Sequence, residues 1–304
     1  MNILAITGAT GRKSGGAFVE ELCRHEDEIR SKFAGGIRAL VRPSSKTENL
    51  KNRELAFDVR AGDFSDVAFL ESALNGVDTL VHIAGITLSP KLVDAAAKCG
   101  VRRLIFVHTT GIYSKYKEAG EEYRRIDTYV KKKCRDHHMM LTILRPTMIY
   151  GNVTDRNVVQ FIQMVDRLPV MPVVNGARYE LQPVHYQDLA AAYYQVLINE
   201  KTTANKNFDL SGGAPIELRE MLITIGNDLG KKVKFINCPF CLAYTGAWMI
   251  YLITLRKKDY REKVQRLCEP RVYSHQDAAD AFGYSPRIFE IGVADEIKEY
   301  ISLR

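Results

Sequence analysis

The chain has 304 residues, of which 46% are hydrophobic and 26% are charged, and these proportions exclude a disordered, collagen-like or coiled-coil protein. Its 43 Lys and Arg residues against 36 Asp and Glu residues give a net charge of +7, which suits an anionic small molecule or an anionic membrane surface. No basic run with interleaved aromatic residues indicates nucleic-acid binding. The six cysteines are scattered and the start MNILAITGATG lacks the marks of a secretory signal, so we expect a cytoplasmic protein without a disulfide framework.

The first half of the chain alternates short apolar segments with longer amphipathic ones. Segments such as ILAI and LIFV are apolar almost throughout, as burial on both faces of a parallel sheet requires. The pattern predicts strands over 2–7, 36–41, 55–60, 79–83, 103–108 and 140–144, and helices over 15–33, 65–74, 90–99 and 119–137. This alternation predicts an α/β fold with a doubly wound parallel sheet over residues 1–150.

The regular alternation of strands and helices ends after Arg145 and Pro146, and prolines at 169, 172 and 183 interrupt the following segment. We expect residues 151–304 to form a smaller C-terminal region that binds the substrate and packs, discontinuously, on the edge of the sheet where ligands bind in such folds.

An uncharged segment, Phe235–Leu255, precedes the cations Arg256, Lys257 and Lys258. Its length would allow a membrane span, but Pro239, Gly246, its polar residues and its place inside a globular chain argue against one. We expect a helix that covers the substrate pocket. The alternative is peripheral membrane contact through Trp248 and the flanking cations, which would suit a quinone or lipid substrate.

A glycine-rich turn, TGATGRKSGG, follows the first predicted strand and opens the first predicted helix. Gly8 allows a sharp turn, and Gly11 removes a side chain where the backbone must approach a pyrophosphate. Free amides at the helix start then face the phosphates, aided by the helix dipole. The context predicts a dinucleotide site that includes Thr10, Arg12 and Lys13.

These features resemble the short-chain dehydrogenase/reductase superfamily of Rossmann-fold proteins, in its extended and atypical branches, which include NAD-dependent epimerases and dehydratases. The superfamily usually has GxxGxxG, whereas this chain has Ser14 followed by Gly15 and Gly16, so either the turn contains a one-residue bulge or Gly15 takes the role of the third glycine. The motifs AGDFSD (61–66), TLVHIAG (79–85) and LTILRPTMIYG (141–151) are similar to later motifs of the superfamily. The resemblance implies cofactor-binding roles for Asp63 (at the adenine), Phe64, Ala84 and Gly85 (beside the ribose), and Pro146 and Thr147 (near the nicotinamide).

The residue after the second predicted strand indicates which nicotinamide cofactor is bound. Enzymes that prefer NAD place a carboxylate there, but this strand ends at Arg42. An arginine can form a bidentate pair with a 2′-phosphate. We therefore expect NADP(H) rather than NAD(H).

The resemblance also implies a catalytic Ser/Thr, a Tyr, and a Lys four residues after the Tyr. Thr110, or alternatively Thr109, matches the hydroxyl and Tyr123 the tyrosine, but the fourth successor of Tyr123 is Asp127. Tyr129 keeps the spacing to a lysine but comes too late in the helix. The proton relay is thus degenerate, and two interpretations stay open: an oxidoreductase or epimerase-like enzyme acting on a small molecule, or a non-catalytic NADP(H)-binding sensor or assembly factor, similar to NmrA-like proteins or a complex I subunit.

Other residues have weaker functional interpretations. Arg178 and His185 would lie on the substrate side, although His185 suits a buried core position equally well. Cys238 and Cys241 have CxxC spacing without a second pair, so we expect no metal site. In the superfamily the helix that carries Tyr123 often pairs subunits, which makes a homodimer conceivable by analogy.

Overall fold

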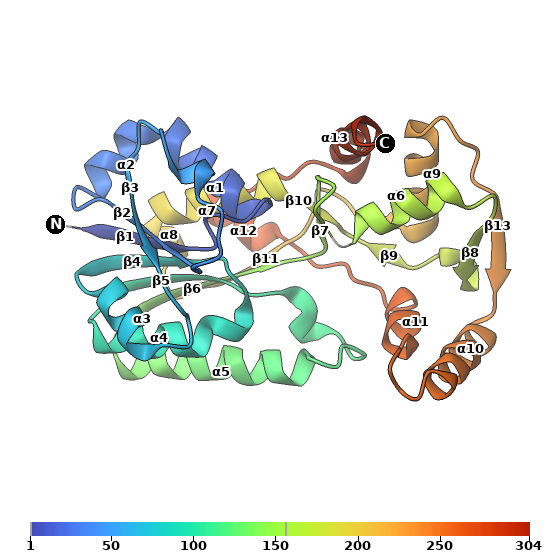
Figure 1. The fold of residues 1–304 in the computed structure, drawn as a ribbon, viewed down its shortest axis with the longest axis horizontal. Coiled ribbons are helices and arrows are strands. Elements are labelled where there is room, and N and C mark those ends of the chain that lie inside the picture. Colours follow the sequence, from blue (N-terminus) through green and yellow to red (C-terminus); the bar gives the residue numbers. More distant parts are fainter. Residues whose placement is uncertain (1, 156) are drawn as a thin grey trace.

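The computed structural model describes residues 2–155 and 157–304, and its centre is a seven-stranded parallel sheet (Figure 1). The strand order is β11-β6-β5-β4-β1-β2-β3. The strands are β1 Ile3–Thr7, β2 Ile37–Val41, β3 Phe57–Ala61, β4 Val77–His82, β5 Arg103–Val107, β6 Met140–Pro146 and β11 Asn207–Leu210. This order confirms the doubly wound Rossmann sheet. Successive strands are added on one side of β1 up to β3 and on its other side from β4 onward, and in such folds the ligand crevice forms at this switch between β1 and β4.

The central strands are apolar because both of their faces are covered. β5 is buried along its whole length, whereas the edge strand β3 is mostly exposed and carries charged residues. On one face pack α1 Ser14–Arg24, α2 Glu26–Lys32, α7 Tyr186–Ile198 and α12 Gln276–Phe282. On the other face pack α3 Val67–Leu74, α4 Ser89–Lys98 and α5 Gly120–Asp136.

The helix predicted over 15–33 is two helices in the structure. The break falls at His25, whose φ of −114° and ψ of 37° are not helical. Three acidic residues, 26–28, follow the break and stabilise a new helix N-terminus through the helix dipole. The His25 ring stacks on Tyr194 of α7, with 4.2 Å between the ring centroids.

The chain after residue 150 contributes to both parts of the molecule. β11 returns to the main sheet beside β6, and α7 and α8 (Glu200–Thr203) directly precede it in the chain. A smaller lobe has its own core. This lobe and the segments that join it comprise β7 Ile149–Tyr150, α6 Val158–Arg167, β8 Met171–Val174, β9 Glu180–Leu181, β10 Val184–His185, β12 Ile216–Glu217, α9 Leu218–Asp228, β13 Phe235–Cys238, α10 Phe240–Ile253, α11 Arg261–Leu267 and α13 Phe289–Ser302.

The sequence predicts one helix over the uncharged segment 235–255, but the structure has a strand followed by a helix there. Its first four residues form β13, which pairs with β8, and Pro239 separates that strand from α10. Figure 1 shows α10 beside α11 at the end of the molecule opposite the N-terminus. Among the described residues, no helix is both long and apolar enough to cross a membrane.

Candidate functional site

The glycine turn between β1 and α1 is packed so closely that several of its glycines leave no room for a side chain. Gly8 has a φ of +82°, and a Cβ atom there would lie 2.9 Å from the amide nitrogen of Ala84. A Cβ atom on Gly15 would lie 2.1 Å from the carbonyl oxygen of Gly8, and one on Gly16 would lie 2.5 Å from that of Gly11. Gly15 therefore provides the close approach of helix to turn that a glycine at position 14 would normally provide.

The turn is held from both sides by asparagine side chains. The Asn49 amide donates to the carbonyl oxygen of Ala9, and the Asn152 amide donates to that of Arg12, each at 2.9 Å. Thr10, Gly11 and Arg12 line an open cavity of about 780 Å³ beside α1. Lys13 lines a different cavity, at the carboxyl ends of the strands.

The remaining residues predicted to bind the cofactor follow the carboxyl ends of β2, β3 and β4. Arg42 is exposed at the end of β2. The carboxylate of Asp63 accepts hydrogen bonds from the Ser65 hydroxyl at 2.6 Å and amide at 2.8 Å, and these bonds lower its pKa. Phe64 is buried, Ala84 is exposed, and Gly85 has a φ of +119°. Neighbouring parallel strands thus bring these residues to the edge of the sheet that also holds the glycine turn.

A second cavity, of about 300 Å³, lies at the carboxyl ends of β5 and β6. We call it the polar cavity. Thr110 and Thr147 line it, and Pro146 adjoins it: Thr110 donates to the carbonyl oxygen of Pro146 at 3.2 Å, and Thr147 donates to that of Gln182 at 2.5 Å.

Four cations line the polar cavity: Lys13, Lys117, Arg266 and Arg271. No Asp or Glu is among its described lining residues. Among the described residues, neither Lys117 nor Arg271 forms an ion pair with a carboxylate, and Arg266 has one, with Glu262 at 3.5 Å. Burial and the nearby charge of Arg266 lower the pKa of Arg271 to about 10 and lower that of Lys117. A cluster of partly desolvated cations, in which Lys117 and Arg271 form no ion pair among the described residues, favours an anionic ligand.

Arg266 and Arg271 come from the C-terminal segment of the chain. Arg266 belongs to α11, and the backbone amide of Arg271 donates to the carbonyl oxygen of Glu180 at 2.9 Å, which fixes it beside β9. The sequence analysis missed Arg266 and Arg271 because they lie in no periodic pattern. Only the density of charge in the segment EKVQRLCEPR, which continues the charged segment RKKDYR, could have drawn attention to them.

The tyrosine predicted to be catalytic is next to this cavity but not among its lining residues. Tyr123 is half-buried on α5, and the ammonium group of Lys117 lies 5.4 Å from its ring centroid. Tyr129 is exposed and donates to Asp94 at 2.7 Å, so it serves a surface contact.

Asp127, at the position of the expected lysine, belongs to a buried network. Its carboxylate accepts from Arg145 at 3.0 Å and pairs with Lys131 at 2.7 Å, and it lies 3.1 Å from Nδ1 of His108. Burial alone would raise the pKa of Asp127, but these partners lower it. Asp127 is therefore a structural anion behind the site.

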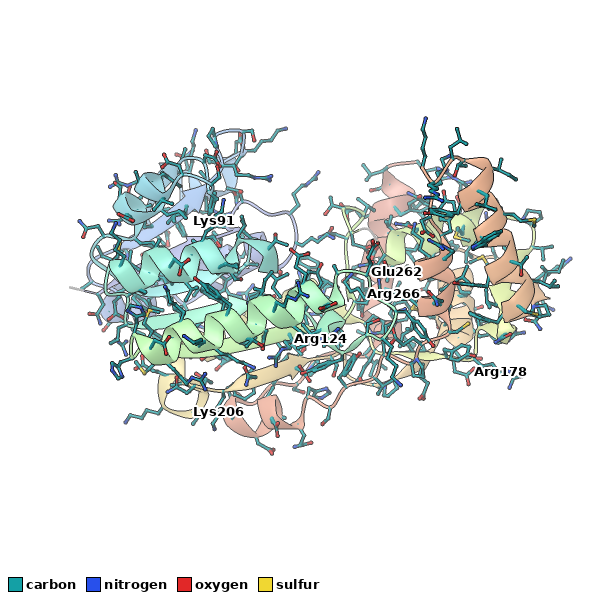
Figure 2. The ribbon with its side chains drawn as sticks, turned by 90° about the horizontal axis from the view of Figure 1, so that it is seen from below. Lys91, Arg124, Arg178, Lys206, Glu262 and Arg266 are labelled. Carbon is teal, nitrogen blue, oxygen red and sulfur yellow. The ribbon has the colours of Figure 1, made fainter. Side chains whose placement is uncertain are left out.

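The two residues predicted to lie on the substrate side are not brought to the polar cavity. His185 is buried beneath the Tyr150 ring and caps α7, with Nδ1 accepting from the Gln187 amide at 3.4 Å. Burial lowers its pKa to about 4. Arg178 is exposed, and Figure 2 shows it near the outer edge of the C-terminal lobe, away from Arg266. Among the described residues, no group of three or more His, Cys, Asp or Glu side chains could hold a metal ion.

The fold and the glycine turn define a dinucleotide-binding protein, and the comparison with known families identifies its class. The model of the NAD(P)H-binding family matches residues 8–168, more than half of the chain, so the chain belongs to this family. An epimerase, a dehydratase and a quinone oxidoreductase structure share its fold at 18–20% sequence identity.

Individual relatives are distant. The N-acetyl-alpha-D-glucosaminyl-diphospho-ditrans,octacis-undecaprenol 4-epimerase of Escherichia coli O157:H7 is 21% identical over 64% of this chain and 67% of its own. A 4-hydroxy-2-methyl-3-oxo-4-farnesyl-3,4-dihydroquinoline-1-oxide ketoreductase of Stigmatella aurantiaca is 23% identical over 90% of this chain and 86% of its own. The structure of an NADPH-dependent quinone oxidoreductase from E. coli, complexed with NADPH, superposes with a TM-score of 0.72 at 20% identity, over 98% of this chain and 99% of that one.

Proposed function

We propose that this protein is an NADP(H)-dependent oxidoreductase or epimerase-like enzyme whose substrate carries a phosphate or diphosphate group and an apolar chain. The observation that carries the proposal is the polar cavity at the carboxyl ends of the strands, where Lys117, Arg266 and Arg271 meet without carboxylates among the described lining residues.

The glycine turn fits a dinucleotide. Added Cβ atoms at Gly8 and Gly15 would strike backbone, so glycine is required there, and the N-terminus of α1 supplies the dipole and amide donors that suit a pyrophosphate. Arg42, exposed after β2, is the residue we assign to the 2′-phosphate of NADP(H). When bound, the nicotinamide supplies or accepts hydride.

The cations of the polar cavity would hold the anionic group of the substrate. Arg271 and Arg266 can each form paired hydrogen bonds with a phosphate, and partial burial strengthens such bonds. Thr110 would orient the reacting oxygen, and Tyr123 is our candidate for proton transfer to or from it. One relative acts on a substrate named as a diphospho compound, which agrees with this assignment.

A third cavity, of about 520 Å³, adjoins the polar cavity. We call it the apolar cavity, because Phe161, Met164 and Leu222 are among the many apolar side chains that line it. Both cavities share Arg266 and Arg271, so an anionic group at these arginines can continue into apolar surroundings. Two relatives have names that include an isoprenoid, undecaprenol in one and farnesyl in the other. We therefore assign the apolar part of the substrate to this cavity.

Calorimetric titration with NADPH and NADH tests the cofactor. We expect NADPH to bind more tightly, and Arg42→Ala to weaken NADPH binding by at least about tenfold while leaving NADH binding unchanged, because only NADPH carries the 2′-phosphate. Arg135→Ala is the matched control, since Arg135 is exposed on α5, distant in sequence from the glycine turn. An equal effect of Arg42→Ala on both nucleotides refutes the NADP(H) assignment.

Oxidation of bound NADPH by a panel of sugar nucleotides, quinones and aldehydes tests the activity. Arg271→Gln should raise KM for an anionic substrate with little change for a neutral one. Tight NADPH binding without oxidation by any member of the panel would instead favour a non-catalytic sensor.

A further inference from the structure

Helix α10 carries its apolar side chains on the outside of the molecule. Its 14 residues include no charged residue, and Ala247 is the one that is buried. Leu242, Met249 and Ile253 are 64%, 52% and 79% exposed. Their spacing of seven and four residues places them on one face of the helix. An ordinary surface helix is polar on this face, so α10 is suited to an apolar environment.

The opposite face of α10 packs on α11. The Arg261 guanidinium of α11 lies 4.1 Å from the ring centroid of Tyr251. The backbone amide at the start of α10 donates to the side-chain oxygen of Asn175 at 2.9 Å. The helix is thus anchored to the lobe, and Figures 1 and 2 both show it at the far end of the molecule from the main sheet.

Positive charge gathers at the end of α10. Arg256, Lys257 and Lys258 are all exposed, and among the described residues none of them pairs with a carboxylate. The next carboxylate, Asp259, is already paired with Arg261 at 2.6 Å. An anionic lipid surface complements both the apolar face and these three cations. A second copy of this chain would complement the apolar face but would bring the same cations.

The length of α10 determines how it can meet a bilayer. Fourteen residues rising about 1.5 Å each give about 21 Å, less than the ~30 Å of a hydrocarbon core. The helix can therefore lie in the interface but cannot cross it. Trp248, which is 45% exposed, suits the boundary between headgroups and acyl chains.

We propose that α10 docks this protein on the surface of an anionic membrane, with Leu242, Met249 and Ile253 facing the acyl chains. Lys263 and Leu267 of α11 line the apolar cavity, so only α11 separates that cavity from the docked helix. Docking therefore places the cavity about one helix diameter, ~10 Å, from α10 and about two helix diameters from the acyl chains below it. If the proposed function holds, the apolar chain of a membrane-anchored substrate reaches the apolar cavity from this surface.

Trp248 provides a direct test because it is the single tryptophan of the chain. We expect its emission to shift to shorter wavelength when vesicles of phosphatidylcholine with phosphatidylglycerol are added, and the protein to co-sediment with them. Vesicles of phosphatidylcholine alone should bind at least about tenfold more weakly, since each basic residue near an anionic surface contributes about 1 kcal/mol.

Two variants separate the apolar face from the charge. Leu242→Ser/Met249→Ser/Ile253→Ser should lower vesicle binding at least about tenfold, because three exposed apolar side chains no longer enter the interface. Its matched control is Ile291→Ser/Ile301→Ser/Leu303→Ser, which changes three equally exposed apolar residues in and just after α13 and should bind as the parent does. Lys257→Glu/Lys258→Glu should weaken binding to the anionic vesicles alone.

Sedimentation velocity without vesicles tests the alternative, in which a second copy of this chain covers the apolar face of α10. A Trp248 shift that depends on protein concentration, accompanied by a dimer that the α10 serine variant abolishes, would overturn the proposal in favour of a second copy. Absence of both co-sedimentation and emission shift would also overturn it. NADPH titration of the same samples reports separately on the proposed function, since none of the substituted residues is placed at the nucleotide site.

Discussion

Replacing Gly15 by alanine tests the assignment of the glycine turn. The new Cβ atom would lie 2.1 Å from the carbonyl oxygen of Gly8, whereas contacts under 3.0 Å essentially never occur, so α1 and the turn must separate by about 1 Å. Overpacking of this kind costs about 1–3 kcal/mol of folding free energy. The same displacement moves the amides that would bind the pyrophosphate, so we expect NADPH affinity to fall at least about tenfold.

Gly246→Ala is the matched control for this substitution. Gly246 lies within α10, and a Cβ atom there meets nothing within 4 Å. Alanine should therefore stabilise the protein by up to about 1 kcal/mol through its higher helix propensity. Denaturant unfolding gives the two free energies of unfolding, and calorimetric titration gives the two affinities for NADPH. If Gly15→Ala matches Gly246→Ala in both, the turn does not require a glycine and the assignment is wrong.

Three further predictions concern buried charge. Asp127→Ala leaves the Arg145 cation without its carboxylate partner, so denaturant unfolding should show a loss of about 3–5 kcal/mol, and a loss below about 1 kcal/mol would contradict the network. Arg103→Ala removes the guanidinium that donates to the last carbonyl oxygens of α7, and it should destabilise by a similar amount, whereas a neutral result would show that these hydrogen bonds are dispensable. Burial, with the nearby Asp155 carboxylate, raises the pKa of Glu296 above its ordinary 4.5, so the folded protein retains a proton that the unfolded chain releases and stability is lost as pH rises above that value. Glu296→Gln should therefore raise Tm relative to the parent at pH 8 but not at pH 4, and equal Tm differences at both pH values would refute the shift.

The local sequence was sufficient to predict six of the seven strands of the main sheet, whereas β11, which comes from the chain after residue 150, was not predicted. The central strands are buried on both faces, so their continuous apolar composition is enough to identify them as strands. The glycine turn is equally local, because it follows the first strand directly. The position of each strand end then places Arg42, Asp63 and Gly85 at one edge, because parallel strands align their carboxyl ends. Gly15 could also be proposed from sequence, since a glycine was needed near position 14.

The break at His25 and the division of 235–255 into strand and helix were not predicted. Both depend on contacts from elsewhere in the chain: the Tyr194 ring on His25, and the pairing of β13 with β8. Local propensity does not record such contacts, so a continuous apolar or amphipathic pattern was interpreted as one helix.

The fold class and the nucleotide-binding edge of this protein were determined by the sequence itself, because adjacent residues carry the periodicity, the turn and the strand ends. The polar cavity was decided only by the tertiary structure: Lys117 follows β5, whereas Arg266 and Arg271 come from about 150 residues further along the chain. The same holds for α10, whose composition could not show which face is covered. Whether a cation is paired or an apolar side chain is exposed depends on what folds against it, and only the three-dimensional arrangement supplies that information.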